Sequence, residues 1–152
     1  MVDITEISAV VAATGVLVGV VYYILDMRNQ ARMRQTDLIM KLSSVIDNIE
    51  FTNTITKILS KHFKDVDELR TECSVPALVA VANFFHRVGI LLERNLVDAD
   101  LVSSILWVQG IWERMNPWII YIRQIFNRPD MFGGFEYLYN EMKKREQQLA
   151  KT

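Results

Sequence analysis

The hydrophobic positions of the chain begin with one continuous apolar segment, residues 7–25. It holds 19 uncharged residues, with acidic residues on both sides. As a helix it would be about 28 Å long, close to the roughly 30 Å of hydrocarbon that a membrane-spanning helix must cross. No Gly or Pro occurs between Gly19 and Pro76, so the helix can continue beyond the apolar segment. The pattern predicts an N-terminal transmembrane helix that continues into a juxtamembrane helix.

The residues that flank this segment favour an uncleaved anchor over a secretory signal peptide. The N-terminal end is acidic, and Tyr22 and Tyr23 begin a bulky stretch where a cleavage site would need small residues. No Lys or Arg precedes the segment, whereas Arg28, Arg32 and Arg34 follow it. The positive-inside rule therefore predicts a single-pass protein of the cell membrane with its N-terminus outside and its C-terminal domain in the cytoplasm. The tyrosines and arginines are the expected interfacial anchor.

Small residues form a stripe along the predicted span. Gly15 and Gly19 make a GxxxG motif, and Ser8 and Ala12 extend it toward the N-terminus. Small residues let two helix backbones approach closely in a membrane. The stripe favours association with a second copy or with another membrane helix, although Gly and Ala are also common in membrane helices for no such reason.

The rest of the chain has the apolar spacing of amphipathic helices. Leu38, Leu42, Val45 and Ile49 form a heptad-like stripe, which could belong to a coiled coil or pack on the chain's own domain. Further helices are expected from Pro76 to about residue 93, across 101–126, and over 135–148. Pro117 predicts a kink or a restart in the second of these.

We therefore predict an all-α protein with one N-terminal transmembrane helix and a cytoplasmic bundle of about four helices. Its expected parts are an anchor with a short tail at 1–27, a juxtamembrane helix at 28–62, and a bundle domain at 63–152 that packs with 36–62.

Composition excludes several classes of function. With 23% charged residues and a net charge of −1, the chain is not expected to bind nucleic acid. Cys73 is the only cysteine, so the chain can form no internal disulfide, and this thiol is expected to pack as a small apolar side chain. Neither metal-binding His spacing nor a phosphate-binding loop is present, so we expect no metal, no cofactor and no catalytic residue.

Three groups of residues are candidates for function. Glu113 and Arg114 lie between two apolar stripes of one predicted helix and are a candidate docking patch. Trp107 and Trp112 are expected in the core, but with His86 they could instead line a ligand pocket. His86 itself is expected to be a hydrogen-bonded residue at the edge of the core.

Several of these residues carry a resemblance to a known family. The motifs are Asn83-Phe-Phe85, Gly89, Leu96-Val-Asp98, Trp112 and Gly134-Phe-Glu-Tyr-Leu138, behind an N-terminal span. The chain resembles an uncharacterised prokaryotic family of membrane-anchored helical domains of unknown function. The resemblance implies one span and an all-α cytoplasmic domain, and it implies no activity.

The residues favour a non-catalytic interaction module held at the cytoplasmic membrane face. Its expected partners are the lipid bilayer, a second copy through the transmembrane helix, or a larger membrane complex in which it is an accessory or regulatory subunit. The alternative is a membrane-tethered enzyme or ligand sensor with its pocket near Trp107, Trp112 and His86.

Overall fold

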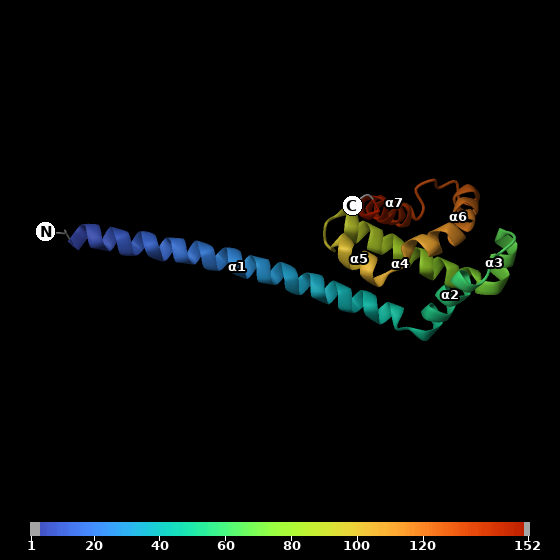
Figure 1. The fold of residues 1–152 in the computed structure, drawn as a ribbon, viewed down its shortest axis with the longest axis horizontal. Helices are drawn as coiled ribbons and strands as arrows, with labels where there is room; N and C mark the ends of the chain where they lie inside the picture. Colours follow the sequence, from blue (N-terminus) through green and yellow to red (C-terminus); the bar gives the residue numbers. More distant parts are fainter. Residues whose placement is uncertain (1–3, 151–152) are drawn as a thin grey trace. The chain divides into compact units, whose positions relative to one another are not determined.

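The computed structural model describes the backbone of residues 4–150 and the side chains of residues 14–38 and 40–150. This part of the chain is helical and contains no strand, which confirms the predicted all-α class. It forms two compact units, Met1–Met40 and Lys41–Thr152. Figure 1 shows the helices in chain order: α1 (Ile4–Ile46), α2 (Ile49–Ser60), α3 (Val66–Cys73), α4 (Val75–Glu93), α5 (Ala99–Ile105), α6 (Val108–Ile125) and α7 (Gly133–Leu149).

Helix α1 contains the predicted span and most of the stripe that follows it. It has 43 residues without a break, about 65 Å at the usual rise per residue. It ends at Ile46, and Asn48 then begins α2, because its side chain accepts hydrogen bonds from the backbone N–H groups of Glu50 and Phe51, at 2.9 and 3.2 Å. The helix thus passes beyond the apolar segment, and the stretch up to residue 60 is completed by a separate capped helix.

The core of the second unit is built around α4, which makes its most extensive contact with α7. Eight residues of α4 are buried, including Phe85 and Gly89. Phe85 stacks on Phe135 of α7 with ring centroids 4.8 Å apart, and Trp112 of α6 meets Phe135 edge to face at 4.9 Å. Aromatic side chains from three helices therefore meet at one point, as such rings do in well-packed cores.

The backbones of α4 and α7 touch where Gly89 meets Gly134. A Cβ atom added at Gly89 would collide with the carbonyl group of Gly134, with its carbon at 2.5 Å. A Cβ added at Gly134 would in turn collide with the carbonyl oxygen of His86. Neither glycine needs its conformational freedom here, because neither has a positive φ. Each glycine matters because it has no side chain at the point where the two helices cross.

The prediction of a single helix across 101–126 is wrong, because α5 ends at Ile105 and α6 begins at Val108. The hydroxyls of Ser103 and Ser104 donate to the carbonyls of Asp100 and Leu101, at 2.8 and 2.7 Å. Such local bonds compete with continued helix, and Leu106 turns to an extended conformation.

Helix α6 contains Pro117 and continues through it, so the predicted alternative of a restart at this proline is also wrong. Pro117 is exposed, as is Glu113, whose carbonyl loses its helical partner because proline has no N–H. Water can reach this side of the helix and satisfy the carbonyl. The helix therefore survives a proline at this position.

Within the described residues, length and composition alone would allow α4 to cross a membrane. In the structure 44% of its apolar window is buried inside the protein, as expected for the central helix of a bundle. Part of the predicted span, residues 7–13, lies outside the described side chains.

The contact at Gly89 yields a direct prediction for stability. Gly89→Ala should lower the free energy of unfolding by about 3 kcal/mol, because the backbones of α4 and α7 must separate to admit the methyl group. Gly133→Ala is the matched control: nothing lies within 4 Å of its added Cβ, and its effect should stay within about 0.5 kcal/mol. Denaturant unfolding of both variants measures the difference. Equal stability of the two variants would contradict the close approach.

Candidate functional site

The first half of α1 exposes its apolar side chains along all its described length. Every residue from 14 to 25 is exposed, with Leu17 at 66% and Tyr22 at 71%. A Cβ added at Gly15 or Gly19 would meet no atom within 4 Å. The side chains of Ser8 and Ala12 lie outside the described residues. The surface of this unit is therefore open at both glycines.

The polar residues that follow on α1 are also exposed. Arg28, Arg32 and Arg34 all present their side chains to solvent, and the amide of Gln30 donates to the carboxylate of Asp26 at 2.9 Å. These positions continue the same helix directly after Tyr22 and Tyr23. An abrupt change from apolar to charged surface thus occurs within one unbroken helix.

Glu113 and Arg114 do not form one patch. Arg114 is half-buried, and its Nη1 donates to the carbonyl oxygen of Lys61, the residue that caps the C-terminal end of α2. A basic side chain is well suited to an unpaired carbonyl at a helix end. Glu113 is exposed on a neighbouring part of the α6 surface. Arg114 thus ties α6 to α2, and Glu113 is the member that faces solvent.

Trp107 lies at the surface, contrary to its expected place in the core. Its side chain is 67% exposed, and it lines a hollow of about 340 Å³ together with Asp100, Gln109, Arg145 and Leu149. Arg145 pairs with Asp100 across this hollow, whereas Glu141, one turn earlier on α7, pairs with Lys144. Tryptophan is among the residues enriched at the hot spots of protein interfaces.

The three residues of the alternative ligand pocket do not share this hollow. Trp112 is 5% exposed and stacks on Tyr139 with centroids 5.6 Å apart, inside the aromatic core. His86 lies at the contact between α4 and α7. Neither lines the hollow at Trp107.

A larger hollow lies between α2 and α4, and no sequence pattern predicted it. It measures about 580 Å³ and is lined by Val45, Phe51, Thr54, Ala77 and Ala80, among others. The small side chains of α4 leave the space, and Phe51 borders it while meeting Phe84 edge to face at 5.0 Å. Such a gap depends on how two helices separate, which periodicity alone does not specify.

His86 is hydrogen-bonded at the edge of the core, as its sequence setting predicted. Its Nδ1 accepts a hydrogen bond from the backbone N–H of Gly134 at 2.9 Å. Burial, and secondarily the nearby charge of Arg87, lower the pKa of His86 below its ordinary value of 6.5. The neutral ring is therefore the favoured form, with its proton on Nε2.

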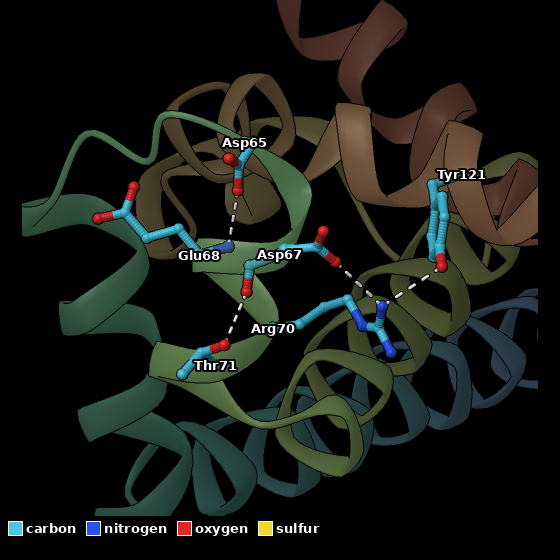
Figure 2. A network of polar contacts seen from close by, with 6 residues as sticks. All are labelled: Asp65, Asp67, Glu68, Arg70, Thr71 and Tyr121. Atoms are coloured by element: carbon cyan, nitrogen blue, oxygen red, sulfur yellow. Dashed lines mark hydrogen bonds and ion pairs between the residues drawn. The ribbon is translucent and has the colours of Figure 1, made fainter.

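A polar network joins α3 to α6, and Figure 2 shows Arg70 at its centre. Arg70 Nη1 lies 3.3 Å from Asp67 Oδ1 and 3.3 Å from the hydroxyl of Tyr121, and its guanidinium lies 5.5 Å from the centre of that ring. Asp65 begins α3 by accepting from the N–H of Glu68 at 2.8 Å. Each of these contacts serves the position of α3, so the network is structural.

Cys73 has the properties of a packed residue and not of a nucleophile. It is 5% exposed, and burial raises the pKa of its thiol above the ordinary value of 9.0. Within the described residues, no three His, Cys, Asp or Glu side chains come together in a way that could hold a metal ion.

The comparisons with known proteins identify the family. Residues 9–142 match the family described as Domain of unknown function (DUF4760), so the chain belongs to it. This confirms the expectation of an uncharacterised family. No curated protein and no solved structure matches the chain. The family assignment therefore covers most of the chain and carries no activity.

Proposed function

We propose that the protein is a non-catalytic helical interaction module, anchored in a membrane by the first half of α1. In this proposal it is an accessory or regulatory subunit, or a homo-oligomer, at the cytoplasmic face of a prokaryotic cell membrane. Its single span places the N-terminus outside and the helical domain inside.

The observation that carries this proposal is the exposed apolar half of α1. An exposed, continuous apolar surface on a helix of this length is unfavourable in water and favourable in a bilayer. The second unit already has a core of its own, centred on α4 and α7. The apolar residues of α1 are thus not needed to complete that core.

Two further features support an interaction role. The arginines after Tyr23 give the helix the charge asymmetry that sets orientation, and they can reach lipid headgroups. The exposed Trp107, with its hollow, and the solvent-facing Glu113 offer a surface on the helical domain for a partner protein. A tether would raise the local concentration of this surface near membrane partners.

Extraction from membranes tests the anchor. The full chain should remain in the membrane pellet after alkaline carbonate treatment. Val16→Arg combined with Val20→Arg should release it, because each charge near the centre of the bilayer costs about 2.5–3.5 kcal/mol. The matched control, Gln30→Arg combined with Thr36→Arg, adds the same charge beyond the apolar segment and should leave the chain in the pellet. Extraction of the unaltered chain by carbonate would contradict the anchor. Retention of the double Val variant would show that a segment other than the first half of α1 holds the chain in the membrane.

Cysteine labelling tests the orientation. The native thiol is unsuitable because Cys73 is buried, so the experiment uses a Cys73→Ser chain with one new cysteine, either Asp3→Cys or Ser104→Cys. Ser104 is exposed on the helical domain. In intact cells an impermeant maleimide should label the chain with Asp3→Cys, and it should label the chain with Ser104→Cys only after permeabilisation. The reverse pattern would overturn the proposed orientation.

Substitution at the glycine stripe tests self-association. Gly15→Ile combined with Gly19→Ile should weaken association of the full chain in membranes by about tenfold, because bulky side chains keep the helix backbones apart. Leu17→Ile combined with Val21→Ile is the control, since these positions lie on the opposite side of the helix. A reporter of helix association in membranes, or crosslinking in detergent, gives the readout. Equal association of both variants would remove the homo-oligomer from the proposal.

A further inference from the structure

The first turn of α7 is held by an unusual combination of contacts. Phe132, the residue that precedes α7, has a φ of 57°, in the left-handed region that side chains other than glycine rarely adopt. Its own side chain makes no capping hydrogen bond to the helix. The free N–H of Gly134 is instead satisfied from another helix, by Nδ1 of His86 at 2.9 Å.

This hydrogen bond exists only while the His86 ring is neutral. A protonated imidazole carries hydrogens on both nitrogens and accepts no hydrogen bond. Its Nδ1–H would then point at the N–H of Gly134, and two donors would face each other. A Cβ atom added at Gly134 would lie 2.8 Å from Nδ1 of His86, so this edge of the ring lies directly against the backbone of α7.

We propose that His86 is a pH-sensitive latch that holds the first turn of α7 on α4 and releases it when protonated. Release would free the segment that includes Phe132, whose ring is buried and stacks on Trp118 with centroids 6.0 Å apart. The device goes beyond the proposed anchoring role and does not depend on it, because every residue concerned lies in the second unit.

The charged groups on the elements next to His86 do not stabilise its protonated form. Arg87, next to His86 on α4, is exposed and disfavours a second positive charge. On the connection to α7, Asp130 pairs with Arg128 at 3.0 Å. On α7 itself, Glu136 pairs with Arg123 of α6 at 2.8 Å. The acidic groups of these two neighbouring elements are thus bound to arginines instead of stabilising a protonated His86.

The direction of the pH effect follows from the lowered pKa. When the latch opens, the pKa of His86 returns toward 6.5, so the open form binds the proton more strongly than the closed form. The stabilising contribution is complete above pH 6.5 and is lost as the pH falls through the pKa of the closed form. Within that window the opening equilibrium should shift toward the open form by up to about tenfold for each pH unit.

Hydrogen exchange of the Gly134 amide in the full chain, in detergent micelles, tests the latch. Its protection, corrected for the intrinsic exchange rate, should fall as the pH is lowered from about 7.5 to about 5. His86→Asn should abolish this pH dependence, because its side-chain oxygen can accept near the position of Nδ1 and does not titrate. His62→Asn is the matched control: His62, the other histidine, is exposed, and its replacement should leave the pH dependence intact.

Two results would overturn the latch. One is a constant protection of Gly134 across this pH range in the unaltered chain, and the other is a pH dependence that persists in His86→Asn. Should that variant not fold, ¹⁵N shifts of the His86 ring in the unaltered chain decide the matter. They should show a proton on Nε2 alone at neutral pH and a second proton that appears together with the loss of protection, whereas separate transitions would contradict the proposal.

Discussion

The contact between the backbones of α4 and α7 determines the arrangement of the second unit. Because Gly89 and Gly134 carry no side chains, the two helices approach closely enough for Phe85 to stack on Phe135. Trp112 then packs against the edge of Phe135 and brings α6 onto the same cluster. Three helices thus depend on one crossing, at which even a single methyl group would be in the way.

Long helices with regular apolar spacing could be predicted from the sequence, because each depends mainly on its own residues. Helices α1, α4 and α7 were expected near their actual positions, and Pro76, at the start of α4, was part of that expectation. The break between α5 and α6 could not be foreseen in this way. It depends on Ser103 and Ser104 bonding back to the chain, while the apolar spacing continues across the break as if one helix were present.

The candidate sites were less predictable, because they depend on contacts between helices. Glu113 and Arg114 are adjacent in sequence, yet consecutive residues of a helix point in different directions, and Arg114 reaches Lys61 on another element. Trp107 fits the apolar spacing but lies at a helix start, where its ring covers Gly110 and still faces solvent. His86 was correctly expected to be hydrogen-bonded, but its acceptor role toward Gly134 requires the fold.

The continuity of α1 has a consequence for how its faces are related. In an unbroken α-helix each residue turns the next by about 100°, so the direction of every side chain is fixed by its count from any other. The face of Gly15 and Gly19 is therefore in fixed rotational register with the arginines that follow it on the same helix. One residue inserted between the glycines and the arginines would rotate one set relative to the other by more than a quarter turn, while leaving the composition of the helix almost unchanged. In this helix the number of residues is as much a structural constraint as their identity.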